Sequence, residues 1–313
     1  MAKMTRRDLI KAAGAGAAVW AATGSVVSPQ EGKLTRERWK LSLNTSTISP
    51  ASLDDKVGAA AKAGYDAIEL WAGDLEKYEK DAKSLPDLGR RIKDLGLEVV
   101  NVIGLWGSMP VKEEDKAKTG EGIRTKLAQA RKVGSKHIAA LPTPDRADMD
   151  VLWAAKRYRE ILDIGKEFGI VPAVEFVGFY KGIHTLGQAA AIAIEADNSD
   201  ACIVCDTFHL YRGGSTFTGV ALMDASAIAV CHFNDVPKEP AQFDLKDADR
   251  IYPGDGILPL PQFLRDLWKT GFRGPLSLEI FNRVEWKKDP FEVARLGLDK
   301  MRRVIAASGV GIF

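Results

Sequence analysis

The sequence contains few cysteines and few histidines for its length. Three cysteines and four histidines occur in 313 residues. An odd and small number of cysteines excludes a fold held together by disulfide bonds. Cys202 and Cys205 lie in one apolar run that is typical of a strand, whereas a redox-active cysteine pair normally opens a helix. We therefore expect the cysteines to be small buried side chains.

An excess of charge of one sign is also missing. The net charge is +2 at pH 7, and Lys3, Arg6, Arg7 and Lys11 place basic charge near the N-terminus. The rest of the chain is close to neutral, so it has no basic surplus with which to bind the phosphates of a nucleic acid. We expect no nucleic-acid partner.

No apolar run in the sequence has the length of a stable membrane span. The run at residues 12–22 is short and rich in alanine and glycine, and it follows the twin-arginine pattern at residues 5–11. We interpret residues 1–33 as a twin-arginine export signal with a short linker, and residues 34–313 as the folded domain. This interpretation predicts a periplasmic or otherwise extracytoplasmic protein. A short amphipathic helix at the N-terminus is the alternative.

The dinucleotide-binding motif G-x-G-x-x-G does not follow the first strand-like run, which argues against a Rossmann fold. Instead, apolar runs alternate with helical patterns, and several of these patterns end at a glycine directly before an apolar run. The strand candidates are residues 40–44, 66–70, 97–103, 137–141, 171–176, 201–206, 228–233 and 276–280. This alternation, without a long break in composition, predicts an α/β fold of one domain, a single (β/α)8 TIM barrel.

Four polar residues stand at the ends of the last four strand candidates: Glu175, Asp206, His232 and Glu279. A barrel carries its chemistry at the carboxyl ends of its strands, so we expect these side chains to meet at one mouth. Three carboxylates and one imidazole, with no thiolate, favour Mn²⁺ over a structural zinc, with Mg²⁺ and Co²⁺ as alternatives. Any one of these acids alone could be an ordinary solvated residue, but the four together predict a site for one divalent metal ion.

Five segments make the chain resemble a known family. They are "VEF" at 174–176, "CDTFHLYRGG" at 205–214, "CHFND" at 231–235, "RIYPGDG" at 250–256 and "LSLEIF" at 276–281. They are similar to motifs of the xylose-isomerase-like TIM barrels, in the sugar phosphate isomerase/epimerase group that includes ketose 3-epimerases, hydroxypyruvate isomerase and inosose dehydratase. The resemblance implies that the four polar residues bind one metal ion. It also implies that Glu175 and Glu279 act as acid and base on opposite faces of a substrate that passes through an enediolate.

Four further residues are candidates for contacts with the substrate. By the same resemblance, His209 of the D-x-x-H motif contacts substrate hydroxyls and Arg250 contacts a substrate oxygen. Glu69 stands at the end of the second strand candidate and Trp106 follows the third, so we expect both at the same mouth, where Trp106 could cover a sugar face. The alternatives are a helix-start histidine, a solvated loop arginine, and a lid or core tryptophan.

The predicted function is that of a divalent-metal-dependent isomerase or epimerase of a sugar or sugar-derived keto compound, by proton abstraction next to a carbonyl. A lyase or dehydratase acting on an inosose or a 3-keto-glycoside is the alternative, because it removes the same proton. A non-catalytic sugar-binding barrel is the second alternative. The four histidines do not fit a DNA-repair endonuclease of the related barrel type, which binds several zinc ions through many histidines. We expect a small carbohydrate as the partner, and self-association stays open.

Overall fold

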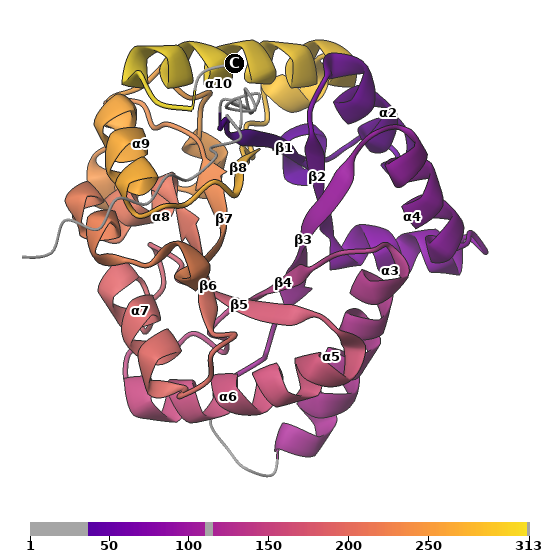
Figure 1. The fold of residues 1–313 in the computed structure, drawn as a ribbon, viewed down its shortest axis with the longest axis vertical. Coiled ribbons are helices and arrows are strands. Elements are labelled where there is room, and N and C mark those ends of the chain that lie inside the picture. Colours follow the sequence, from indigo (N-terminus) through magenta and orange to yellow (C-terminus); the bar gives the residue numbers. More distant parts are fainter. Residues whose placement is uncertain (1–36, 110–114, 312–313) are drawn as a thin grey trace, which may run out of the picture. The chain divides into compact units, whose positions relative to one another are not determined.

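Residues 37–109 and 115–311 are described by a computed structural model. Eight parallel strands form a closed barrel, in which β1 pairs with both β2 and β8 (Figure 1). The strands are β1 (Lys40–Asn44), β2 (Ala67–Trp71), β3 (Glu98–Leu105), β4 (His137–Ala140), β5 (Val171–Glu175), β6 (Cys202–Asp206), β7 (Ile228–Phe233) and β8 (Pro275–Leu278). The prediction of a single (β/α)8 barrel is confirmed. The predicted export signal at 1–33 lies outside the described residues.

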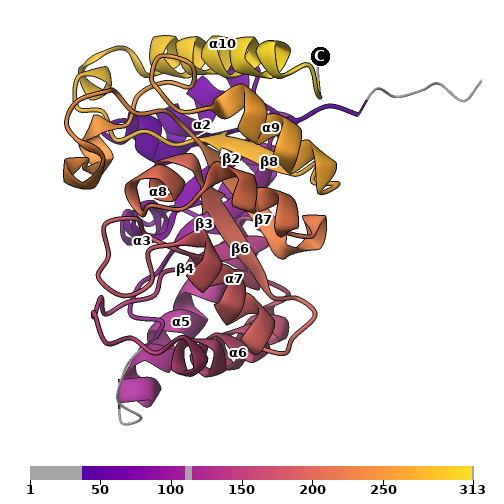
Figure 2. The same ribbon diagram turned by 90° about the vertical axis from the view of Figure 1, so that its left-hand side faces the viewer.

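The helices lie outside the ring of strands, as Figures 1 and 2 show from two directions. They are α2 (Leu53–Ala63), α3 (Ala72–Lys80), α4 (Leu85–Asp94), α5 (Asp115–Lys132), α6 (Val151–Phe168), α7 (Leu186–Glu195), α8 (Thr207–Arg212), α9 (Leu260–Lys269) and α10 (Pro290–Ser308). Short 3₁₀ turns are η1 (Thr45–Ile48), η2 (Phe217–Leu222), η3 (Ala225–Ala227), η4 (Gln242–Asp244), η5 (Asp247–Asp249) and η6 (Glu285–Lys287). Helix α10 packs against both α9 and α2, so it covers the place where β8 closes on β1.

Glycines end two of the predicted helices in the way the sequence indicates. Gly64 follows α2 with φ 91°, and Gly169 follows α6 with φ 67°. Both angles lie in the left-handed region, which glycine adopts without the steric cost of a Cβ. The chain can therefore turn within a few residues from each helix into β2 and β5.

Alternation along β6 separates an inner and an outer layer of the core. Cys202 and Val204 belong to a cluster with side chains of β3, β4, β5 and β7, whereas Ile203 and Cys205 belong to the larger cluster shared with the helices. Successive side chains of a strand point to opposite faces, so Asp206 points into the barrel with Cys202 and Val204. All three cysteines are free and buried, as predicted.

A long loop between β7 and β8 is held in place by one buried carboxylate. Asp235 accepts hydrogen bonds from the backbone N–H groups of Val236, Gly254, Gly256 and Leu258, at 2.9 to 3.1 Å. These bonds fold the loop back on its own start. The loop thereby acquires a fixed path, and Asp247 and Arg250 within it reach the mouth of the barrel.

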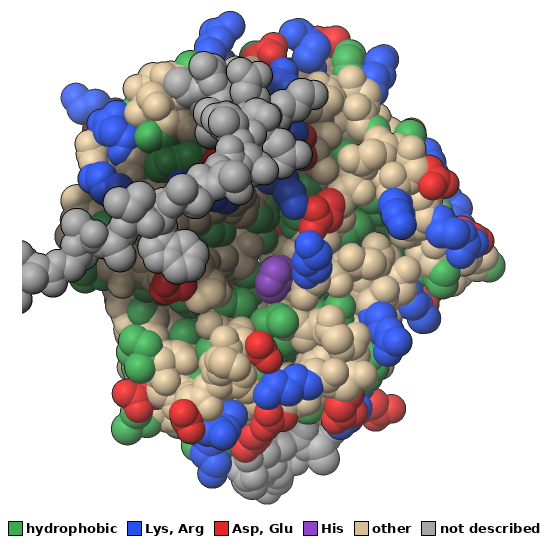
Figure 3. All heavy atoms as spheres, viewed as in Figure 1, with side chains coloured by type: hydrophobic (Ala, Val, Ile, Leu, Met, Phe, Trp, Pro, Cys, Tyr) green, Lys and Arg blue, Asp and Glu red, His purple; other side chains and the backbone are tan. Residues whose placement is uncertain are grey.

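The charge of the surface and the length of the helices concern two expected absences, of a nucleic-acid partner and of a membrane span. Basic and acidic side chains are interspersed on the face drawn in Figure 3. Within residues 37–109 and 115–311, no helix combines the length and apolar character needed to cross a membrane.

Candidate metal centre

The four predicted ligands meet in the barrel. Each of Glu175, Asp206, His232 and Glu279 is buried and offers one ligand atom, and these atoms all lie within 4.8 Å of one another. His232 Nδ1 lies 3.1 Å from Glu175 Oε1, 3.0 Å from Glu279 Oε2 and 3.4 Å from Asp206 Oδ2. Glu175, Asp206 and His232 are on β5, β6 and β7, and Glu279 follows β8 directly. Four neighbouring strands thus bring one candidate ligand each to the same place.

The polar atoms of this cluster fit a divalent metal ion. His232 Nδ1 is buried without a hydrogen-bond partner, although it is surrounded by carboxylate oxygens. An unpartnered buried nitrogen is costly unless something binds it. Three carboxylates and one imidazole are ligands that Mn²⁺, Mg²⁺, Co²⁺ and Zn²⁺ accept. The residues could therefore hold one such ion through His232 Nδ1.

Burial and mutual charge shift the pKa values of the cluster. Burial raises the pKa of Glu279 to about 7, against the positive charges of His232 and Arg250. Burial lowers the pKa of His232, but the carboxylates of Glu279 and Glu69 outweigh it and hold that pKa well above 6.5. Burial also opposes ionisation of Asp206, yet the guanidinium of Arg250 holds its pKa well below 3.8. The acids outnumber the positive groups around them, which favours binding of a cation.

Glu69 lies below the pocket and not among its lining residues, where we expected it. Its carboxylate is fully buried, and Oε1 is 3.0 Å from His232 Nε2. Glu69 also accepts hydrogen bonds from three side-chain donors, Asn44 on β1, Asn101 on β3 and Ser277 on β8. The reason is that β2 continues for two residues beyond Glu69. Trp71 therefore points to the same side as Glu69, nearer the carboxyl end of the strand, and it lines the mouth of the cavity instead.

His209 and Arg250 present two N–H donors to the same point. The backbone N–H of Gly178 donates to His209 Nδ1 at 3.1 Å. Burial lowers the pKa of His209, so the ring is neutral near pH 7 and carries its proton on Nε2. This nitrogen lies 3.1 Å from Arg250 Nη2, which is also a donor. One oxygen acceptor would satisfy both, which fits the predicted substrate contacts.

A cavity of about 250 Å³ opens above the cluster, and aromatic side chains make up much of its wall. Trp106 lines it and is 47% exposed. Glu175 and Glu279 reach the cavity from strand ends, His209 from α8 and Arg250 from the loop between β7 and β8. The other lining residues are Trp71, Ile103, Leu141, Val177, Phe179, Tyr180, Asp247 and Phe281. A cavity of this size, with acids at its floor and rings around it, suits a small polyhydroxy compound.

The family follows from one comparison. The model of the family described as xylose isomerase-like TIM barrel matches residues 57–304. The chain belongs to the xylose isomerase-like TIM barrel family. The resemblance stated from the sequence motifs is therefore confirmed at the level of the family.

Named relatives within the family carry out more than one reaction. An inosose isomerase of Bacillus velezensis is 26% identical over 274 residues, which cover 85% of this chain and 97% of that protein. A 3-dehydroshikimate dehydratase of Pseudomonas aeruginosa is 25% identical over 244 residues, 77% of this chain but 38% of that protein. The crystal structure of the IOLI protein with a bound zinc atom has a TM-score of 0.79 at 25% identity, covering 85% of this chain and 98% of that one.

Two residues at the site, Asn44 and Asp247, were not predicted from the sequence. Asn44 donates to Glu69 and to Glu279, at 2.9 and 3.0 Å, and accepts from Trp71 Nε1 at 2.8 Å. Asn44 ends the first strand, so the same rule that selected Glu175 would have found it. Asp247 had no such signal, because it lies within the long loop.

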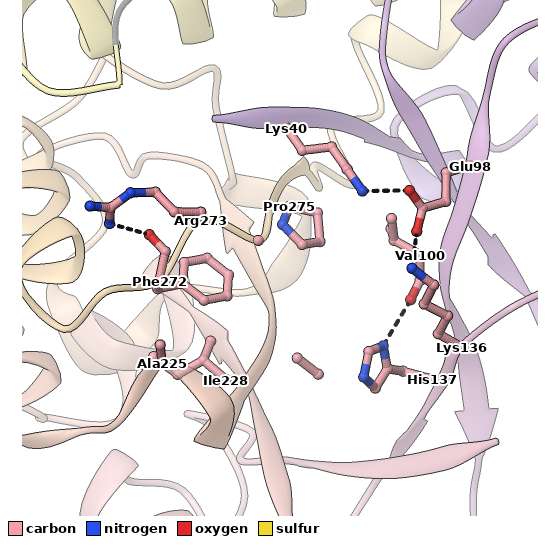
Figure 4. Close-up of a pocket in the computed structure, with 12 residues that line it drawn as sticks. Lys40, Glu98, Val100, Lys136, His137, Ala225, Ile228, Phe272, Arg273 and Pro275 are labelled. Carbon is pink, nitrogen blue, oxygen red and sulfur yellow. Dashed lines mark hydrogen bonds and ion pairs between the residues drawn. The ribbon is translucent and has the colours of Figure 1, made fainter. Parts of the chain in front are cut away.

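A second cavity of about 290 Å³ lies at the opposite end of the barrel (Figure 4). Three of its charged side chains bind one another, since Glu98 pairs with both Lys40 and Lys136. His137 lines it, and its Nδ1 lies 3.2 Å from the carbonyl oxygen of Val100. In barrels of this fold this end contributes to stability, and the chemistry takes place at the other end.

Proposed function

We propose that this protein is a divalent-metal-dependent isomerase or epimerase of a polyhydroxy ketone. The observation that carries the proposal is the position of Glu175 and Glu279. They extend from β5 and from the end of β8, both reach the cavity, and both lie about 3 Å from His232 Nδ1. Two carboxylates that approach one small cavity from different strands can act as base and acid on one substrate.

The residues divide the reaction between them. One of the two glutamates takes the proton from the carbon next to the carbonyl, and the other returns a proton to the substrate. His209 and Arg250 hold a substrate oxygen between their N–H groups. The aromatic wall excludes water from the carbanionic carbon. A divalent ion, when bound, supplies Lewis-acid stabilisation of negative charge on oxygen next to the reacting carbon.

Mn²⁺ is the ion we propose, because three of the four ligands are carboxylates. The zinc in the structure of the IOLI protein makes Zn²⁺ the competing ion for this test. Apoprotein loaded with each ion in turn should be most active with Mn²⁺, and higher activity with Zn²⁺ would overturn the choice of metal.

Dehydration is the second candidate, because the 3-dehydroshikimate dehydratase matches 77% of this chain. The same base can remove a proton next to a carbonyl and expel a hydroxyl from the neighbouring carbon. The two functions differ in their products. In D₂O, an isomeric ketone that carries deuterium at the exchanged carbon supports isomerase or epimerase, whereas an unsaturated product supports dehydratase.

The assignment of acid and base is tested by Glu175→Gln and Glu279→Gln. At saturating metal, each should keep the fold and lower kcat by about 10²–10⁴-fold. Glu195→Gln is the matched control, because Glu195 is exposed at the end of α7. Unchanged turnover in either variant would contradict the proposal. Absence of any turnover in the wild type, with metal bound, would favour a non-catalytic sugar-binding protein.

We also propose export by the twin-arginine route, on the basis of Arg6 and Arg7. Replacing both with lysine should leave the protein in the cytoplasm of the expressing cell, as fractionation would show. Recovery of the variant outside the cytoplasm in wild-type amounts would contradict this.

A further inference from the structure

Asp247 places a carboxylate at the mouth of the cavity that neither metal binding nor proton transfer uses. It begins η5 in the loop between β7 and β8 and is half-buried. Its Oδ1 accepts from Arg250 Nε at 3.2 Å and from Nη2 at 2.9 Å. Within the part of the chain that the structure describes, Oδ2 receives no hydrogen bond. One oxygen of Asp247 is therefore left to accept a hydrogen bond from a substrate.

Arg250 has no pair of free donors for an acidic substrate. Arginine carries five N–H donors, and a carboxylate or phosphate is held best by two of them in parallel. Nη1 donates to Asp206 and Glu279, and Nε and Nη2 donate to Asp247. The remaining N–H faces His209 Nε2. The guanidinium can thus offer one hydrogen bond to a substrate oxygen, but not a paired contact.

The charge of the site also disfavours an acidic substrate. No lysine is among the described residues that line the cavity. Its charged groups are the carboxylates of Glu175, Glu279 and Asp247 and the guanidinium of Arg250, with those of Asp206 and Glu69 directly below. A bound divalent ion and Arg250 together carry fewer positive charges than these five carboxylates carry negative ones, so the site keeps an excess of negative charge. A substrate with its own negative charge would enter against this field.

Aromatic rings stand on two sides of the cavity. Trp71 lies beside Trp106 and Phe281, with ring centroids 6.4 and 5.7 Å apart, on the side of β2, β3 and β8. Phe179 and Tyr180, 5.8 Å apart, follow β5 on the other side of the closed barrel. The faces of rings in these positions suit the C–H faces of an uncharged polyol.

We propose that the cavity selects uncharged polyhydroxy ketones and that Asp247 is the residue that rejects substrates bearing a carboxylate or phosphate. Its Oδ2 accepts a hydrogen bond from a substrate hydroxyl and repels an anionic group at the same place. This inference rests on the proposed function for the identity of the substrate as a polyhydroxy ketone. The inference predicts that an inosose, which is uncharged, binds better than 3-dehydroshikimate, which carries a carboxylate; these compounds appear in the names of two relatives.

Binding to the manganese-loaded protein tests the inference without reference to turnover. The probes are an inosose, which is uncharged, and 3-dehydroshikimate, which carries a carboxylate. Titration calorimetry should give a Kd for the inosose at least about tenfold lower than that for the acid. Asp247→Asn keeps an oxygen that can accept from Arg250 but removes the charge, so the ratio of the two Kd values should shrink by about tenfold.

Asp244→Asn is the matched control, because it removes an acid from the same loop at an exposed position outside the cavity lining. It should leave the ratio of Kd values unchanged. Higher salt should reduce the preference of the wild type and have little effect on Asp247→Asn.

Three results would overturn the inference. They are equal or tighter binding of the acid by the wild type, an unchanged ratio in Asp247→Asn, and failure of the wild type to bind the inosose. Selective binding of the inosose without any turnover would instead contradict the proposed function and leave the specificity of Asp247 standing.

Discussion

His232 Nε2 lies 3.0 Å from Glu69 Oε1 in the buried floor of the cavity. This contact holds a proton on Nε2 and leaves Nδ1 to face the carboxylates of the metal cluster. Asn44, Asn101 and Ser277 all donate to Glu69, so its own orientation is fixed. Glu69 thereby positions a candidate metal ligand, His232, and is not itself one of the four candidates.

Replacing Glu69 with glutamine should weaken metal binding without removing a ligand. The glutamine side chain would turn its N–H₂ group toward side chains that now donate hydrogen bonds to the Glu69 carboxylate. The imidazole of His232 would then lose the partner that fixes its orientation. We expect the metal Kd to rise about 10- to 100-fold, measured by competition with a fluorescent chelator. Glu195→Gln, an exposed change, should leave the Kd unaltered. Equal metal affinity in Glu69→Gln and wild type would refute the role.

Metal binding should stabilise the folded protein through Asp206. Wild-type protein should bind about one divalent ion per chain, and removal by a chelator should lower Tm. At a free metal concentration of about 100 times Kd the stabilisation is about 2.7 kcal/mol. Asp206→Asn should lose most of the difference in Tm between metal-loaded and chelator-treated protein. Asp224→Asn provides the comparison, because Asp224 caps a surface turn through Ser226 and should retain the full difference.

A methyl group at Gly256 should damage the site through the loop. A Cβ there would collide with the carbonyl of Val236 and the carboxylate of Asp235, which holds the loop by its backbone. We expect Gly256→Ala to lower the free energy of unfolding by about 1–3 kcal/mol and to reduce kcat by displacing Arg250.

The control for this change is Gly58→Ala on α2. A Cβ at Gly58 meets no atom within 4 Å, so this variant should be as stable as the wild type, or more stable by up to about 1 kcal/mol. Similar denaturation midpoints for the two variants would contradict the importance of the Asp235 loop.

His137 should make the protein less stable in mild acid. Burial lowers its pKa below the ordinary 6.5, and the charge of Lys136 adds to this. As the pH falls below about 6.5, the unfolded chain takes up a proton that the folded chain does not, so the free energy of unfolding decreases until the folded pKa is reached. The contribution of the neutral His137 side chain to the free energy of unfolding is therefore fully present above pH 6.5 and decreases below it.

Urea denaturation between pH 8 and pH 5 measures this effect. His137→Gln should show a smaller loss of stability between these pH values than the wild type, with the value at pH 8 as the internal reference for each protein. A loss of the same size in both proteins would exclude His137 as the cause.

Much of the fold could be predicted from the sequence because strands and helices differ in period. The predicted ranges 40–44 and 228–233 coincide with β1 and β7. Alternation along the sixth strand also separated Asp206, which points inward, from Cys205, which packs toward the helices. Both results depend only on local pattern, and neighbouring strands of a closed barrel then bring the ligands together.

The contacts within the site depend on how neighbouring strands are staggered, and this is not a local property. Glu69 and Trp71 lie on the same side of one strand, but their heights in the barrel follow from pairing with Asn44 and Asn101. The prediction from the sequence placed Glu69 at the mouth, but the inward-facing residue at that height of β2 is Trp71, two residues further on. Asp247 is set by a loop whose path depends on the distant carboxylate of Asp235.

The candidate ligands and part of the cavity wall come from different strands of the barrel. The four candidate ligands come from β5 to β8, whereas Trp71, Ile103, Trp106 and Leu141 contribute to the wall from β2, β3 and β4 and the residues that follow them. Ile103, Trp106 and Leu141 can therefore be replaced without removing a candidate ligand, whereas Glu69 and Asn44 of the same half contact His232 and Glu279 directly. These three wall positions are the place to begin when the shape of the cavity is to be changed by engineering.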